Sequence, residues 1–109
     1  MDQLDRSANM GTGISLLGLL PRFEALQSVH RVILFGSRAR GDAAERSDID
    51  MAVDAPDIGI LEWDTLHQRI IEQSQTLLPL DIVWLQQAPK FLKRQIERDG
   101  VVIFERQEP

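Results

Sequence analysis

The sequence predicts an α/β (α+β) protein, a small mixed β-sheet of about four strands covered by helices. Two observations support this fold class. Short apolar runs rich in β-branched residues recur along the 109-residue chain, and such runs are typical of buried strands. Longer stretches with apolar residues at helical spacing lie between them. Strands that alternate with helices in this way form a sheet with helices packed over it.

Length and composition indicate one modest domain. At 109 residues and 43% apolar, the chain can bury a single core. Residues 1–13 are polar and lack periodicity, so we expect a flexible N-terminal tail there. Residues 14–109 are then the single folded domain.

Charge and composition exclude several classes of function. The net charge of −5 argues against direct nucleic-acid binding, because phosphate backbones are bound mainly through clustered Lys and Arg. No apolar stretch approaches a membrane span, and Ile14–Leu20 lacks the basic flank and cleavage site of a signal peptide. The absence of cysteine rules out disulfides and thiolate metal sites, and fits a cytoplasmic protein.

The first elements are a helix and a strand. From Ser15 the apolar residues fall at helical spacing with Pro21 inside the pattern. Either the helix kinks at Pro21, or Pro21 lies in the first turn of a helix over 22–28. Val32–Phe35 is a short β-branched and aromatic run that Gly36 stops after one strand's length, which predicts a buried strand.

The residues after this strand are suited to phosphate. Gly36 has no Cβ, so its backbone can turn sharply and let a ligand come close. Ser37 offers a hydroxyl and a backbone N–H at the expected start of a short helix, where unpaired N–H groups attract phosphate. Arg38 and Arg40 follow and can reach triphosphate oxygens or a docked partner. Alternatively, they are solvated or pair with the nearby Asp42 and Glu45.

A second strand begins with two acids. Gly41 is expected to end the short helix, and Asp48 and Asp50 follow at positions i and i+2 of a strand. Both carboxylates therefore leave the same face. Two acids held this close repel each other unless a cation lies between them. Hard oxygen ligands beside a phosphate-type turn favour Mg²⁺, which is usually shared with substrate phosphates.

Two metal ions need a third acid, and the chain has one in another strand. Leu80–Leu85 is strand-like, and Asp81 is its only charge. A lone carboxylate is costly to bury in an apolar strand, and a metal would be its partner. The alternative is that Gly36 starts an ordinary turn, Asp48 is a cap, and Asp50 and Asp81 are solvated strand ends.

The main covering helix is predicted from Leu61 or Glu62 to Leu78, and Pro79 ends it. Its buried face is marked by Trp63, Leu66, Ile70 and Leu77. Together with Trp84, Trp63 is expected in the core, with an adenine platform as the alternative.

A last helix and strand complete the chain. Ala88-Pro89 opens the helix, Gly100 ends it, and Val101–Phe104 forms the fourth strand. The helix has a basic face that is solvated or contacts an acidic partner, formed by Lys90, Lys93, Arg94 and Arg98.

The acidic and glycine motifs resemble a known signature. Gly36-Ser37, a ten-residue spacer and Asp48-x-Asp50 are similar to the signature of the DNA polymerase β-like nucleotidyltransferase superfamily. The fuller wording Phe-Gly-Ser-Arg-Ala-Arg-Gly and Ser-Asp-Ile-Asp resembles its minimal nucleotidyltransferases (MNT), commonly the MntA-type antitoxins of HEPN/MNT toxin–antitoxin pairs. The resemblance runs from Leu16 to Phe104.

This resemblance implies a polymerase β-like fold and a specific activity. The family implies transfer of AMP from ATP to a tyrosine hydroxyl of a partner HEPN toxin, a protein adenylylation that neutralises the toxin. We expect two Mg²⁺ ions and ATP at the site. The residues expected to carry the activity are Asp48, Asp50 and Asp81 as catalytic metal ligands and Gly36, Ser37, Arg38 and Arg40 as nucleotide-binding residues.

The sequence restricts the acceptor. The chain contains no tyrosine, so a tyrosine acceptor must come in trans. A chain of 109 residues leaves no room for an acceptor domain, which favours an acceptor that brings its own surface. Two alternatives remain open: a non-catalytic antitoxin that acts by occlusion, and a nucleotidyltransferase that acts on a small-molecule hydroxyl.

Overall fold

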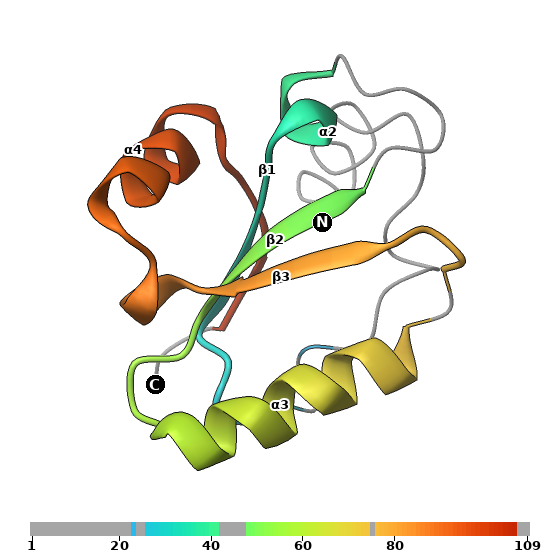
Figure 1. Cartoon of the computed structure of the whole chain (residues 1–109), viewed down its shortest axis with the longest axis vertical. Helices are drawn as coiled ribbons and strands as arrows, with labels where there is room; N and C mark the ends of the chain where they lie inside the picture. The colour runs from blue at the N-terminus through green and yellow to red at the C-terminus, as the bar shows by residue number, and fades with distance from the viewer. Residues whose placement is uncertain (1–22, 24–25, 42–47, 75, 107–109) are drawn as a thin grey trace.

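The computed structural model describes residue 23 and residues 26–41, 48–74 and 76–106 (Figure 1). The elements in chain order are β1 (Arg31–Phe35), α2 (Ser37–Arg40), β2 (Ile49–Asp54), α3 (Ile60–Gln73), β3 (Leu80–Trp84), the 3₁₀ helix η2 (Leu85–Gln87), α4 (Lys90–Asp99) and β4 (Val101–Glu105).

The four strands form one mixed sheet in the order β3-β2-β1-β4. β1 is antiparallel to both β2 and β4, whereas β2 and β3 are parallel. A parallel pair needs a crossover connection, and α3 supplies it between β2 and β3 (Figure 1). The predicted mixed sheet covered by helices is confirmed.

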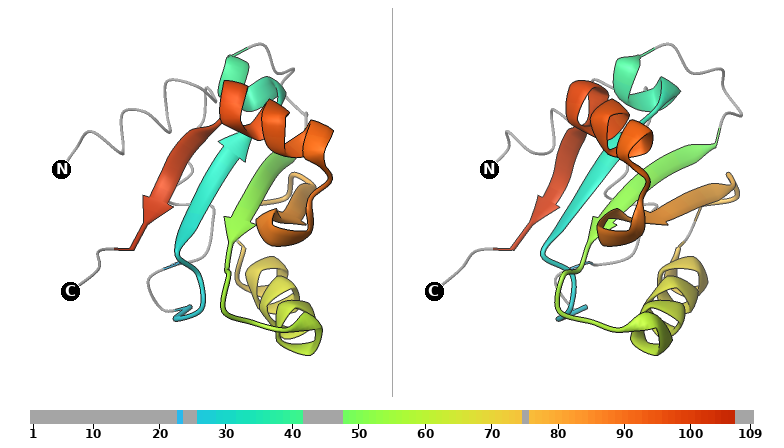
Figure 2. Two further views of the ribbon diagram at one scale, coloured as in Figure 1. Left: turned by 90° about the vertical axis from the view of Figure 1, so that its left-hand side faces the viewer. Right: turned by 60° about the vertical axis from the view of Figure 1, so that its left-hand side comes forward.

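Alternation along β2 divides the core between the two faces of the sheet. Ile49, Met51 and Val53 belong to the cluster that α3 covers. Ala52 points the other way and belongs to the cluster that contains Ile96 of α4. Asp50 and Asp54 share the Ala52 parity, so the acids of β2 lie on the α4 face. Figure 2 shows the two helices on separate sides of the strands.

The end of α3 differs from the prediction. The helix stops at Gln73 instead of Leu78, because Ser74 has an extended backbone with ψ of 140°. The Ser74 hydroxyl then accepts a hydrogen bond from the Thr76 N–H at 3.3 Å, a local bond that competes with the helix. Leu77 is 102% exposed, so its assignment to the buried face is wrong.

The other predicted positions of α3 point inward. Leu66 and Ile70 are buried, and Trp63 is half-buried. The Trp63 and Trp84 rings stack with centroids 5.4 Å apart and an interplanar angle of 12°. The Trp84 indole N–H donates to the Ala55 carbonyl at 3.0 Å. Both rings therefore belong to the core rather than to a nucleotide platform.

The remaining element boundaries agree with the prediction within a residue or two. Leu85 belongs to η2 and not to β3. Pro89 and Gly100 cap α4 at its two ends. Most of the predicted first helix and the N-terminal tail lie outside the described residues, so the division at residue 13 stays a prediction. Among the residues that are described, no helix is both long enough and apolar enough to cross a membrane.

Candidate active site

The turn after β1 is built on two glycines. Gly36 has φ 78° and ψ −157°, and Gly41, which ends α2, has φ 85°. Side chains rarely tolerate a positive φ, so both positions favour glycine. Between them α2 forms as predicted, and the Arg40 N–H donates to the Gly36 carbonyl at 3.1 Å. The phosphate-suited turn is therefore a fixed part of the fold.

Gly36 also lies directly against an acid of the second strand. A Cβ at this position would collide with Oδ2 of Asp50. The strand register explains the contact, because Asp50 pairs with Phe35, the neighbour of Gly36. The Asp50 carboxylate consequently lies directly against the backbone of the turn. Any side chain at position 36 would displace it.

Asp81 lies beside Asp50 across the parallel pair. The register places the two residues opposite each other, close enough for the Asp81 charge to act on Asp50. Asp81 is exposed because β3 is an edge strand, so the expectation of a buried carboxylate is wrong. Its place in a strand next to Asp50 agrees with the prediction.

Asp48 completes the acidic cluster from outside the strand. β2 begins at Ile49, so Asp48 precedes the strand instead of lying within it, and it is exposed. Its charge still reaches Asp50. We call Asp48, Asp50 and Asp81 the acid cluster.

The acid cluster changes the protonation of its central member. Burial, followed by the charges of Asp81 and Asp48, raises the pKa of Asp50 from 3.8 to about 6, and the Arg40 charge opposes the rise. A cation bound between these acids would reduce the repulsion between their charges.

The donor set suits Mg²⁺ only when the substrate completes it. Within the described ranges, no three His, Cys, Asp or Glu side chains have the arrangement of a finished metal site. Mg²⁺, however, usually binds proteins through one or two carboxylates together with water and substrate phosphates. Asp50 and Asp81 opposite each other, next to a phosphate-suited turn, fit that mode of binding.

The two arginines of α2 have different surroundings. Arg38 is 2% exposed, which leaves little of its side chain for a docked partner. The side chain of Arg40 is 42% exposed, and its Nη1 lies 3.7 Å from Oδ2 of Asp99 at the end of α4. The acids proposed as alternative partners, at positions 42 and 45, lie outside the described residues. Phosphate contact by either arginine stays a prediction.

Asp99 is the residue near the site that the sequence interpretation missed. It is the last residue of α4, where the helix dipole disfavours a negative charge. An acid at the wrong end of a helix is therefore the signal that could have indicated it.

Fold and site together define a class, a small α/β domain with the glycine turn and acidic strands of a nucleotidyl-transferring protein. The chain belongs to the Polymerase beta, Nucleotidyltransferase family, which it matches over residues 19–109. No curated protein matches the sequence.

Solved toxin–antitoxin structures share this fold. A toxin–antitoxin with AMP-PNP has 29% identity and a TM-score of 0.54, over 73% of this chain and 64% of that chain. A mutant of the toxin–antitoxin MntA-HpeT has 25% identity and a TM-score of 0.60, over 77% and 67%. An MNT antitoxin in complex with a tri-AMPylated Shewanella oneidensis HEPN toxin has 24% identity and a TM-score of 0.50, over 78% and 64%, and shows the fold alone. This chain thus spans 64–67% of the length of these matched chains.

Proposed function

We propose that this protein is a Mg²⁺-dependent nucleotidyltransferase that transfers AMP from ATP to a tyrosine hydroxyl of a partner HEPN toxin and thereby neutralises it. The observation that carries the proposal is the position of Asp50, which lies opposite Asp81 in the parallel pair and directly against Gly36. Family membership supports nucleotidyl transfer. The relative with bound AMP-PNP supports an adenine nucleotide, and the relatives' toxin–antitoxin assemblies support a toxin as partner.

Each part of the site has a role in this reaction. When bound, Mg²⁺ would lower the pKa of the attacking hydroxyl and neutralise charge on the triphosphate. Asp48 and Asp50 would hold Mg²⁺ with the triphosphate. Asp81 would hold the metal that activates the attacking hydroxyl and would take the proton of that hydroxyl. The backbone at Gly36 and the hydroxyl of Ser37 would bind phosphate oxygens. The acceptor oxygen attacks the α-phosphorus, the bond to the β-phosphate oxygen breaks, and pyrophosphate leaves.

The position of Asp81 supports an acceptor from another protein. Asp81 is exposed on the edge strand β3, so a second protein can approach the acid cluster from that side. The sequence contains no tyrosine that could serve as an acceptor within the chain. A tyrosine on the partner's surface would satisfy both conditions.

The test is the intact mass of the partner. We would co-express the chain with the protein encoded by the neighbouring gene and compare wild type with the double variant Asp48→Ala/Asp50→Ala. The matched control is Asp64→Ala, which removes an exposed acid of α3 on the opposite face of the sheet. Whole AMP increments with wild type and with the control, but none with the double variant, are expected.

An unmodified partner that is still bound and silenced equally by all three versions would contradict the proposal. Occlusion would then be the function. AMP found instead on a small-molecule hydroxyl would leave the chemistry intact and change the substrate.

A further inference from the structure

Arg40 connects the phosphate turn with the end of α4. Its backbone N–H donates to the Gly36 carbonyl at 3.1 Å, which fixes the residue to the turn. Its guanidinium lies 3.7 Å from the Asp99 carboxylate. The Arg40 charge also acts on Asp50, so the same guanidinium is within electrostatic reach of the acid cluster. Arg40 is therefore near enough to interact both with Asp99 and with the acids that would hold the metal.

Asp99 lies in an unfavourable position for an acid. The C-terminal end of a helix carries partial negative charge, so a carboxylate there is destabilising unless a cation compensates. Two cations do so, Arg40 from α2 and the preceding Arg98, whose Nε lies 3.2 Å from Oδ1 of Asp99. The Asp99 side chain is 13% exposed, whereas that of Arg98 is 70% exposed. The carboxylate is thus turned toward the protein, where Arg40 lies.

The end of α4 is fixed to the sheet. Gly100 closes the helix by donating to the Ile96 carbonyl at 2.7 Å. A Cβ at Gly100 would collide with that carbonyl and with the side chain of Ile33 in β1. The end of α4 therefore approaches β1 closely at Gly100. Figures 1 and 2 show α4 next to α2 at one end of the strands.

We propose that Asp99 is a positioning residue, which holds the Arg40 guanidinium beside the phosphate turn so that it can bind the triphosphate of the nucleotide. A guanidinium has five N–H donors and can bind a carboxylate and phosphate oxygens together. This role rests on the proposed function, since it requires a nucleoside triphosphate at Gly36. It assigns to α4, which contributes no member of the acid cluster, a part in nucleotide binding.

The experiment measures binding of AMP-PNP with Mg²⁺ to the full chain by calorimetry. Arg40→Ala should weaken binding about tenfold, the size of one charge-assisted contact to phosphate. Asp99→Ala should weaken it about threefold to fivefold, as expected for one partly exposed ion pair. Asp99→Asn should fall between wild type and Asp99→Ala, because the amide keeps an acceptor oxygen near Arg40 but loses the negative charge. The control Arg98→Ala should stay within about twofold of wild type, since that pair is exposed.

The decisive variant is Arg40→Ala/Asp99→Ala. If Asp99 acts through Arg40, the double variant binds no more weakly than Arg40→Ala alone. Additive losses, unchanged binding, or tighter binding by Asp99→Ala would overturn the positioning role while nucleotide binding stands. Wild type that binds no AMP-PNP with Mg²⁺ would instead overturn the proposed function, and this role with it. If Asp99→Ala does not fold by circular dichroism, Asp99→Asn against Arg98→Ala decides the question.

Discussion

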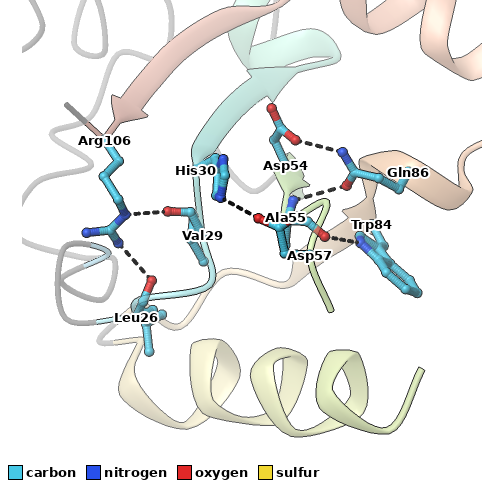
Figure 3. A network of polar contacts seen from close by, with 9 residues as sticks. All are labelled: Leu26, Val29, His30, Asp54, Ala55, Asp57, Trp84, Gln86 and Arg106. Carbon is cyan, nitrogen blue, oxygen red and sulfur yellow. Dashed lines mark hydrogen bonds and ion pairs between the residues drawn. The ribbon is translucent and has the colours of Figure 1, made fainter. Parts of the chain in front are cut away.

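Asp50 and Asp54 lie four residues apart on the same strand and the same face, yet their surroundings are opposite. Asp54 accepts a hydrogen bond from Arg31 Nε at 2.8 Å. It accepts a second one from Gln86 Nε2 at 2.7 Å (Figure 3). Asp50 instead lies opposite Asp81. One end of the sheet satisfies its acid, and the other gathers like charge. The polar contacts of Asp54 stabilise the fold at its end of the sheet. The like charges around Asp50 are typical of a functional site.

The satisfied end of the sheet is a connected network. Gln86 also accepts from the Ala55 N–H at 3.0 Å, and Arg106 donates to the carbonyls of Val29 and Leu26, both at 2.8 Å (Figure 3). Across the described part of the chain, every buried side-chain polar atom has a hydrogen-bond partner. The acid cluster therefore differs from the rest of the described structure in its repulsion between like charges. It does not differ in having unsatisfied hydrogen-bonding groups.

The largest expected effect is on AMP transfer. Asp50→Asn should reduce the rate about a thousandfold or more, because a neutral amide cannot replace a carboxylate that holds a metal. Asp54→Asn, its counterpart at the other end, should stay within about threefold in the folded protein. Initial rates of labelled AMP incorporation measure both. Equal losses in two folded variants would break the distinction between the ends.

The two glycines that flank α2 give the next largest effect. Gly36→Ala should cost about a hundredfold in transfer, because its Cβ displaces Asp50 from the turn. Gly41→Ala meets no atom within 4 Å and has a similar φ of 85°, so it should lose only about 1 kcal/mol of stability. Rates and urea unfolding of the pair separate the two effects. Full activity of Gly36→Ala would show that the turn is not part of the active site.

The pKa of Asp50 near 6 predicts a pH dependence of metal binding. Mg²⁺ competes with the proton on Asp50, so its affinity should fall about tenfold per pH unit below pH 6 and level off above it. Calorimetric titration with AMP-PNP and Mg²⁺ between pH 5 and 8 measures this. In Asp50→Asn the remaining affinity should lose that inflection. A midpoint near pH 4 in wild type would contradict the raised pKa of Asp50.

The smallest effect is on stability, where Asp50→Asn and Asp54→Asn should change the free energy of unfolding in opposite directions. A carboxyl whose pKa is raised in the folded state contributes its full stabilisation below the unfolded pKa of 3.8. This stability is lost progressively as the pH rises through about 6. Near pH 7 in EDTA, Asp50→Asn should thus stabilise the protein by about 1 kcal/mol, allowing for its partial exposure. Asp54→Asn should destabilise it by about 1–2 kcal/mol through the weakened bond to Arg31. Urea unfolding decides, and equal signs would break the comparison.

The sequence predicted what local chemistry determines. Gly36 and Gly41 at positive φ, and the acid on each of two neighbouring strands, follow from short patterns. What failed depended on competition or on topology. The hydroxyl turn at Ser74 outcompeted the helix and left Leu77 exposed, and the exposure of Asp81 follows from strand order, which periodicity does not encode.

The pairing of Arg40 with Asp99 is a contact across 59 residues of sequence and could not be predicted from either helix alone. Each residue, taken separately, is a charged group on a short helix in an acidic chain. Only the packing of α4 against β1 brings them together.

The place of β3 in the sheet has a further consequence for the behaviour of the protein in solution. Among the described strands, β3 forms one border of the sheet, and the outer backbone groups of such a border invite strand pairing with a second molecule. An exposed charge discourages that pairing, and Asp81 supplies the only one in β3. We therefore expect the carboxylate that we propose for catalysis also to discourage self-association. Variants that neutralise Asp81 should therefore lose solubility as well as activity.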